Sequence, residues 1–198
     1  MRNYQKYVVA FVLVALAALN YSPVEAQINY RSTSVFSAKI LGTSTLHDWE
    51  MNSPNGNCSC TVLLDANNKI TGVSNLSFTI KVESFLSEHK LMNTKTYEAL
   101  KSNKFPNITY VLTSATVTQI NATTSLIKSR GKLTIAGVTK DAEIDAYCAV
   151  SASDQSITCK VVKKMKMTDF SVTPPAVMMG SIKTGDDITI EFNFKLTK

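Results

Sequence analysis

The sequence contains few of the residues from which enzymes build active sites: two histidines and one tryptophan among 198 residues. Neither His47 nor His89 stands at a zinc-binding spacing from the cysteines. No serine or cysteine lies in a recognisable nucleophile motif, and strand alternation places Asp48 on the face opposite His47. We therefore expect a protein that is not an enzyme, binds no metal and needs no cofactor.

Long apolar runs are absent after the first 26 residues. The run Tyr7–Leu19 follows two basic residues and precedes small residues at Val24–Ala26. It is shorter than the roughly 20 residues of a membrane-spanning helix, and no cysteine follows it directly, which argues against a lipid anchor. The pattern predicts a cleaved signal peptide over residues 1–26, one domain over residues 27–198, and a periplasmic or secreted location.

Charged residues are also sparse, at 18%, and the net charge of +6 is spread along the chain. No arginine-rich stripe is present, so we expect no nucleic-acid partner. The modest positive charge instead favours an anionic head group or contact with a membrane surface.

Apolar and polar residues alternate along nearly all of the chain after residue 30, which is typical of strands with one buried face. About nine strands are predicted, at 33–41, 43–51, 58–65, 76–82, 108–118, 126–136, 142–151, 156–167 and 188–196. So many half-buried strands favour a barrel or a sandwich. One helix is predicted over Ser87–Ser102, with Ser87 as its N-cap and Leu91, Tyr97 and Leu100 as its apolar stripe. One long loop is predicted over Ser171–Asp187.

The hairpin around Ser153-Asp154 can be placed in register from the sequence. Apolar residues then face each other: Val150 and Ile157, Cys148 and Cys159, Ala146 and Val161. On the other face acids oppose lysines, Glu143 with Lys164 and Asp141 with Lys166, at roughly 0.2–1 kcal/mol per pair.

This register suggests a Cys148–Cys159 disulfide, which would stabilise the chain by about 3 kcal/mol in the chain-entropy model. Bridged cysteines also suit an exported protein. Cys58 and Cys60 lie two residues apart on one strand face, so either they are free or they pair with the other two cysteines across the barrel.

Several inward-facing side chains are candidate ligand contacts. His47 shares a face with Trp49, and it either binds a ligand's polar head or is a core histidine satisfied by a backbone carbonyl. Lys163 falls inward with Met165 and Met167, where its ammonium either meets an anionic head group or extends out of the barrel end. The remaining candidates are apolar lumen residues: Phe78, Ile80, Phe192 and Phe194.

Five stretches, in this order, resemble the YceI-like family: Ser34-Val35-Phe36, Thr45-Leu46-His47-Asp48-Trp49, Leu100-Lys101-Ser102 with Phe105-Pro106-Asn107-Ile108, Gly131–Lys140, and Lys166–Phe170. The resemblance implies an all-β, antiparallel, lipocalin-like barrel with a short helical segment covering one end. It also implies a periplasmic protein that binds a polyisoprenoid or similar lipid. The sequence departs from the commoner family pattern in Asp48-Trp49, its four cysteines and its methionine-rich loop.

Two functions follow from this reading. The first is a protein that holds a long-chain apolar or amphiphilic ligand, either polyisoprenoid, quinone-like or another lipid, in the barrel lumen. The second is a structural or interaction protein of the cell envelope whose barrel is packed. Contact with a membrane surface and homodimerisation are further hypotheses.

Overall fold

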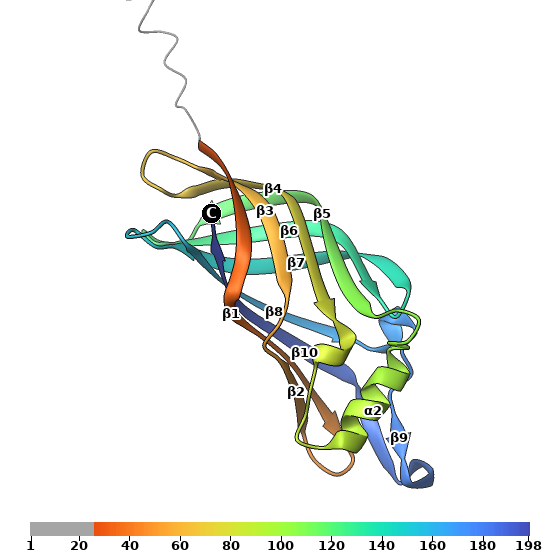
Figure 1. Cartoon of the computed structure of the whole chain (residues 1–198). Helices are drawn as coiled ribbons and strands as arrows, with labels where there is room; N and C mark the ends of the chain where they lie inside the picture. The colour runs from red at the N-terminus through yellow and green to blue at the C-terminus, as the bar shows by residue number, and fades with distance from the viewer. Residues whose placement is uncertain (1–25) are drawn as a thin grey trace, which may run out of the picture.

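A computed structural model describes residues 26–198, and the predicted signal peptide, apart from its last residue, lies outside this range. The described chain is an antiparallel β-barrel with one α-helix against one end (Figure 1). Its elements are β1 (Ala26–Ser44), β2 (Trp49–Ser53), β3 (Asn57–Leu64), β4 (Ile70–Lys81), η1 (Val82–Ser84), α2 (Lys90–Ala99), β5 (Asn107–Gln119), β6 (Thr124–Ile135), β7 (Val138–Val150), β8 (Ile157–Lys166), η2 (Thr168–Phe170), β9 (Ala176–Val177), η3 (Met178–Gly180) and β10 (Ile182–Thr197).

The barrel closes because the long first and last strands pair with each other. The sheet order is β2-β1-β3-β4-β5-β6-β7-β8-β10-β9, and β1 also pairs with β10. Among the strands, β2 pairs only with the second half of β1, and β9 pairs only with the start of β10, so both extend the wall at one end. Asn52 of β2 also forms a single β-bridge with Leu86. The predicted all-β, antiparallel, lipocalin-like barrel with a short helical segment is thus confirmed.

The predicted strand over 43–51 is wrong, because residues 45–48 form a turn between β1 and β2. The Ser44 hydroxyl stabilises this turn: it donates to the carbonyl of His47 at 2.7 Å and accepts the amide hydrogens of Leu46 and His47. A serine that bonds the backbone two or three residues ahead favours a turn over continued strand pairing.

The predicted helix is present but shorter, and Ser87 is not its N-cap. The N-cap residue is His89, whose side chain makes no capping bond. Ser87 instead donates to the His89 carbonyl and to the Asn93 side chain, in the turn that leads into α2. The predicted loop Ser171–Asp187 also contains β9, η3 and the start of β10.

The predicted register of the β7–β8 hairpin is confirmed where the two strands pair, from Ala146–Val161 to Val150–Ile157. The predicted ion pairs farther along the strands are wrong, because β7 stays with β6 while β8 follows β10 and the hairpin splays open. The charged side chains find partners on these other neighbours: Glu143 binds Arg130, Asp141 binds Lys132 and Lys166 binds Asp187.

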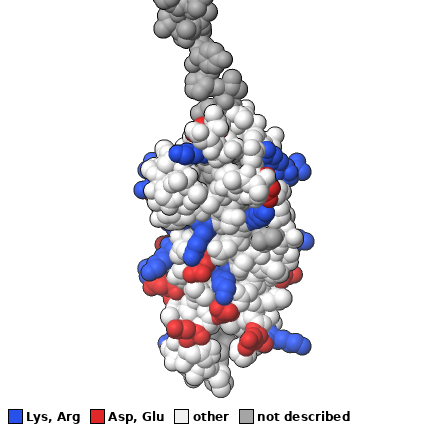
Figure 2. Space-filling model, turned by 90° about the vertical axis from the view of Figure 1, so that its left-hand side faces the viewer, with Lys and Arg blue, Asp and Glu red and all other residues white. Residues whose placement is uncertain are grey.

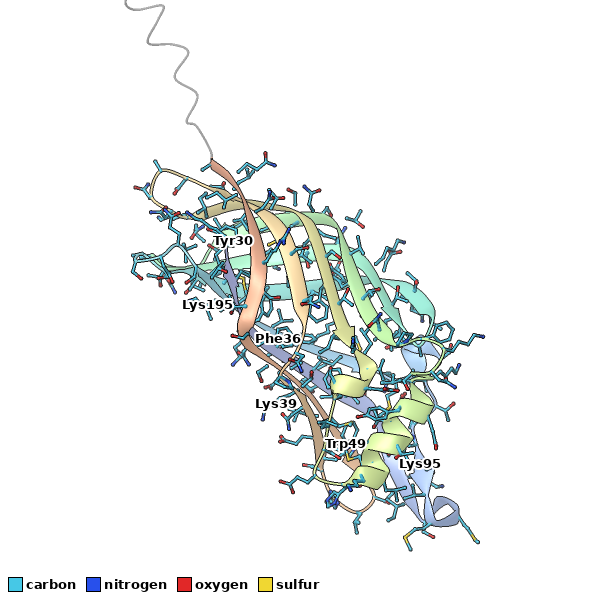
Figure 3. The ribbon with its side chains drawn as sticks, viewed as in Figure 1. Tyr30, Phe36, Lys39, Trp49, Lys95 and Lys195 are labelled. Carbon is cyan, nitrogen blue, oxygen red and sulfur yellow. A yellow bond between two sulfur atoms is a disulfide. The ribbon has the colours of Figure 1, made fainter. Side chains whose placement is uncertain are left out.

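The half of the barrel far from α2 is filled by its own side chains. Tyr30, Val62, Leu64 and Ile157 are buried there, and all four cysteines belong to the same cluster. The Cys148–Cys159 disulfide is present, whereas Cys58 and Cys60 are buried free thiols. Figure 3 shows Tyr30 in this half, Phe36 nearer the middle of the barrel and Trp49 beside α2.

A layer of four phenylalanines crosses the middle of the barrel. Phe78 and Phe192 meet edge to face with ring centroids 5.1 Å apart, and Phe36 lies 6.2 Å from Phe78, Phe192 and Phe194. This Phe layer links the packed cluster around Tyr30 to a second cluster that includes Met51 and Phe85. An edge-to-face aromatic pair contributes roughly 0.5–1.5 kcal/mol beyond burial, which stabilises the Phe layer between the two clusters.

The family-like stretch Gly131–Lys140 forms the end of β6, a tight turn and the start of β7. Both turn residues have positive φ, 49° at Ala136 and 81° at Gly137, as a two-residue hairpin with the right twist requires. A Cβ on Gly137 would lie 2.4 Å from the ring of Phe105, so the glycine also lets the chain after α2 pack against the turn. Within residues 26–198, no helix has the length and apolar character needed to span a membrane.

Candidate functional site

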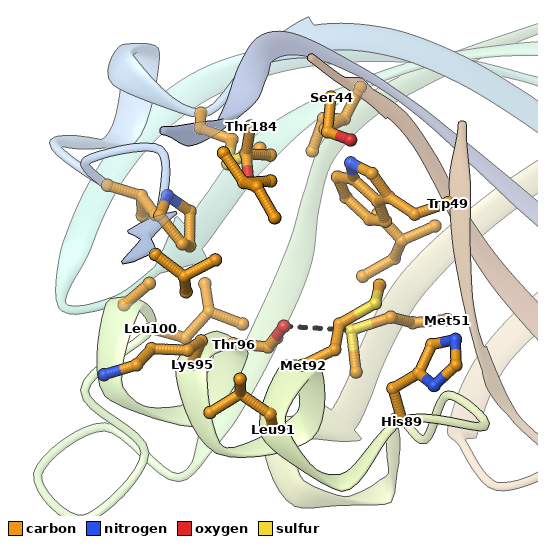
Figure 4. Close-up of a pocket in the computed structure, with 18 of the residues that line it drawn as sticks. Ser44, Trp49, Met51, His89, Leu91, Met92, Lys95, Thr96, Leu100 and Thr184 are labelled. Carbon is orange, nitrogen blue, oxygen red and sulfur yellow. Dashed lines mark hydrogen bonds between the residues drawn. The ribbon is translucent and has the colours of Figure 1, made fainter. Parts of the chain in front are cut away.

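The other half of the barrel is hollow. A cavity of about 440 Å³ lies between the strands and α2, within the roughly 300–1,000 Å³ typical of small-molecule sites. Residues of β1, β2, α2, β6, β8 and β10 and of the segment between β8 and β10 line it, and most of them are apolar (Figure 4). The strands place their inward face on the cavity, and α2 lies across its mouth.

α2 contributes one continuous face to the cavity wall. Leu91, Met92, Lys95, Thr96, Ala99 and Leu100 line the cavity, and none of the residues of α2 itself is buried. Their spacing of one, three and four residues puts them on the same side of a helix. The opposite contact is made by Tyr97, whose hydroxyl donates to the carbonyls of Glu83 and Phe85 and holds α2 against η1.

The β1–β2 hairpin supplies the wall that faces α2. Trp49 donates its indole N–H to the carbonyl of Thr43 at 2.9 Å, and its ring lies over Gly42. A Cβ on Gly42 would come within 2.2 Å of the indole, so only glycine lets the ring lie against the strand. His47 lies in the exposed turn at the cavity mouth, with its Nδ1 2.6 Å from the carbonyl oxygen of Asp48.

Methionines make much of the wall adaptable. Met51 of β2 and Met92 of α2 lie next to each other in the cavity wall, and Thr96 donates a hydrogen bond to the sulfur of Met51 at 3.0 Å (Figure 4). Met165 and Met167 line the cavity from β8 and the residue after it. Unbranched thioether side chains conform to irregular apolar ligands, so the wall suits a flexible chain.

The cations at the mouth are already paired. Lys95 binds Glu98 at 2.7 Å, and Lys166 binds Asp187 at 2.9 Å, an interaction that raises the pKa of Lys166. Both pairs are solvent-exposed, and such pairs contribute little stability but leave no bare charge in the cavity. The site is therefore apolar in its interior, and the lysines that line it lie at its solvent-exposed edge.

The structure gathers four of the predicted ligand contacts around this cavity: His47, Trp49, Met165 and Met167. Phe78, Ile80, Phe192 and Phe194 do not line it, because they pack into the Phe layer and the cluster next to it. Lys163 is half-buried opposite Ile190 on β10 and is also not part of the cavity wall. Whether any of these residues binds a ligand stays a prediction.

Sequence reasoning missed most of the residues of α2 that line the cavity. The apolar stripe was predicted through Leu91, Tyr97 and Leu100, but Tyr97 belongs to the face that packs on η1. The repeated pairs Leu91-Met92, Lys95-Thr96 and Ala99-Leu100, each four residues apart, were the available signal for the correct face.

The acids, histidines and free cysteines are candidate metal ligands and nucleophiles among the described residues. No group of three or more His, Cys, Asp or Glu side chains among residues 26–198 is placed to hold a metal ion. Burial raises the pKa of the Cys58 thiol to about 12 and that of the Cys60 thiol to about 11, so both are protonated near neutral pH. A protonated buried thiol is a poor nucleophile.

Comparisons with known proteins agree on the family and the fold. The profile of the YceI-like domain family matches residues 23–196. No curated protein was found with significant similarity to the chain.

Three solved structures illustrate the likeness. The Burkholderia cenocepacia protein BcnA is 17% identical, with a TM-score of 0.63 over 84% of this chain and 99% of that protein. A polyisoprenoid binding domain from Saccharophagus degradans is 9% identical, with a TM-score of 0.62 over 87% of this chain and 99% of that domain. The YceI protein of Campylobacter jejuni is 25% identical, with a TM-score of 0.53 over 71% of this chain and 82% of that protein.

Proposed function

Since the chain belongs to the YceI-like domain family, we propose that it is an exported carrier that holds a long-chain apolar or amphiphilic molecule in the cavity beneath α2. The observation that carries the proposal is a barrel that is packed in one half and hollow in the other, with apolar walls around the hollow. A fully packed interaction protein would have no reason to leave this space empty, because each unfilled methylene of a core costs about 0.8 kcal/mol or more.

The ligand class follows from the walls. Burying each methylene of a lipid tail contributes about 0.8 kcal/mol, so a tail of several methylenes binds without any specific polar contact. Polyisoprenoid or quinone-like tails fit this chemistry, and the solved domain from Saccharophagus degradans is described as polyisoprenoid-binding. The hydroxyls of Ser44, Thr96 and Thr184 lie at the wall, where a head group would meet them.

Export to the periplasm or beyond is part of the same proposal. The residues before β1 carry the pattern of a signal peptide, and the Cys148–Cys159 disulfide suits an oxidising compartment. We propose no reaction on the ligand, since the cavity wall offers no activated nucleophile beside a base.

The first test is native mass spectrometry of the mature protein from its own host, followed by organic extraction of any bound molecule. A stoichiometric lipid supports the carrier function. An empty protein that also refuses added polyprenol and ubiquinone contradicts it.

A matched pair of variants then locates the binding site. Thr96→Trp places an indole in the cavity, whereas Thr94→Trp makes the same change on the exposed side of α2. If the indole displaces on the order of three methylenes of the ligand, binding weakens by about 2.4 kcal/mol, or roughly fiftyfold in Kd. The Thr94 variant should bind as the wild type does, and equal affinities of the two variants would rule out this cavity.

A further inference from the structure

Four large apolar side chains are exposed at the cavity end of the barrel. They are Leu46, Leu91, Met178 and Met179, with exposed fractions of 65%, 61%, 72% and 108%. They come from three separate segments, namely the β1–β2 turn, the start of α2, and η3. We call these four residues the apolar rim. Figure 1 shows the three segments at the same end of the molecule, and Figure 2 shows that the lowest part of this end carries no charged side chain on the visible face.

The backbone of η3 holds its two methionines outward at a conformational cost. Met178 and Met179 have φ values of 52° and 55°, and Gly180 follows at 88°. Left-handed backbone is unfavourable for residues with a side chain, so two adjacent methionines in this state indicate a constrained, functional tip. The tip is tied down by hydrogen bonds from Thr184 to the Pro175 carbonyl and between the backbones of Thr45 and Lys183.

The opposite end of the barrel is built differently. Its turns are polar, and their polar groups form hydrogen bonds with one another. The Asn121 side chain accepts hydrogen bonds from the amides of Thr123 and Thr124, and the Gln155 side chain donates one to Asn68. Ile120 is the one large exposed apolar residue that the described turns of this end contain. The four largest exposed fractions among the large apolar residues of the described chain thus belong to the apolar rim. Apolar side chains gathered around one opening are typical of an interaction surface.

We infer that the apolar rim inserts into the surface of a lipid bilayer, so that the cavity mouth opens toward the membrane. The inference rests on the proposed function, because a carrier of lipid tails must exchange them with a bilayer. Leu46 and Leu91 belong to both the rim and the cavity wall, so the apolar surface of the rim continues into the site. Three tips around one opening suit a flat partner better than a groove-binding peptide.

The test uses ligand-free protein and uncharged vesicles of palmitoyl-oleoyl phosphatidylcholine in a flotation assay. The Met178→Ser/Met179→Ser variant removes the two most exposed rim side chains, and we expect its vesicle partitioning to fall at least about tenfold. The control Val111→Ser/Ile120→Ser removes equally apolar side chains, exposed by 52% and 51%, from the wall and the far end. It should float with vesicles as the wild type does.

Salt and assembly state separate this inference from its alternatives. Binding through apolar insertion persists at 1 M NaCl, where the Debye length is about 3 Å, so binding abolished by salt would overturn the inference. A wild-type dimer that the methionine variant dissociates, seen by analytical ultracentrifugation, would assign the rim to a second copy of the chain instead.

Failure of the inference and failure of the proposed function are distinguishable. Met178 and Met179 do not line the cavity, so their variant should keep wild-type affinity for polyprenol in vesicle-free buffer. Thr96→Trp should lose that affinity and still float with vesicles. Wild-type protein that binds polyprenol but ignores vesicles refutes only the bilayer docking.

Discussion

Removal of the Cys148–Cys159 disulfide should lower the free energy of unfolding by about 3 kcal/mol. The bridge joins residues 11 apart in sequence, and a loop of this size gives about 3 kcal/mol in the chain-entropy model. The bond sits in the only stretch where β7 and β8 pair, between Ala146–Val161 and Val150–Ile157. It therefore also links two long strands that pair over only five residues, as few as any two neighbouring long strands of the described barrel.

The perturbation is the double substitution Cys148→Ala/Cys159→Ala, and the matched control is Cys58→Ala/Cys60→Ala. All four cysteines lie in one buried cluster, so each double variant removes two buried sulfurs, but only one removes a covalent link. For a domain of this size about 3 kcal/mol corresponds to roughly 6–12 °C in Tm. The difference in the free energy of unfolding between the two variants therefore reports the effect of the covalent bond, because the loss of buried sulfur packing is common to both.

Urea unfolding followed by far-UV circular dichroism measures both free energies. The bridge-free variant should have a midpoint well below that of the control. A gap under about 1 kcal/mol between the two variants would refute the reasoning, because the denatured chain would then gain little freedom from losing the link.

Two further predictions concern titratable groups. Native protein at pH 8 should not react with iodoacetamide at Cys58 or Cys60, since burial raises their thiol pKa values to about 12 and about 11. Both cysteines should react once urea unfolds the barrel. Labelling of the native protein as fast as that of an exposed free thiol would contradict this prediction. Hydrogen bonds from the hydroxyl and amide of Thr168 lower the pKa of Asp186 below its ordinary value of 3.8. The ionised carboxylate therefore stabilises the folded state fully above pH 3.8, and this stabilisation is lost as the pH falls through the lower pKa of the folded state. Thermal melts from pH 6 to pH 2 should accordingly show a weaker acid dependence for Asp186→Asn than for the wild type or the exposed-site control Asp145→Asn, and identical slopes would contradict the assignment.

The barrel was predictable from sequence because each strand carries its own alternation. The β7–β8 register is the clearest case, since apolar residues oppose each other at each inward-facing pair that the two strands share. The same reasoning failed beyond Ala146, where the ion pairs were assigned to Lys164 and Lys166. Alternation states which face a residue takes, but it does not state which neighbouring strand follows it when a hairpin splays.

The binding site was predictable only in part. Trp49, Met165 and Met167 were placed on the inner face by parity, and they line the cavity. Phe192 and Phe194 share the inner face of β10, yet the cavity lies on Ile188 at the other side of the Phe layer. The alternation along a strand predicts which residues face the interior of the barrel. It does not predict where along the barrel axis the packed core ends and the cavity begins, because that depends on the stagger of all the strands.

The Phe layer separates the packed half of the barrel from the residues that line the cavity. On one side of it lie the disulfide and the tightly buried cluster around Tyr30, and on the other side lies the cavity wall of methionines and aliphatic residues. Substitutions in the cavity half can reshape the cavity while the packed half preserves the closed strand order. The shape of the cavity can therefore change through a few substitutions in α2 and the β1–β2 hairpin, while the packed half keeps the fold unchanged.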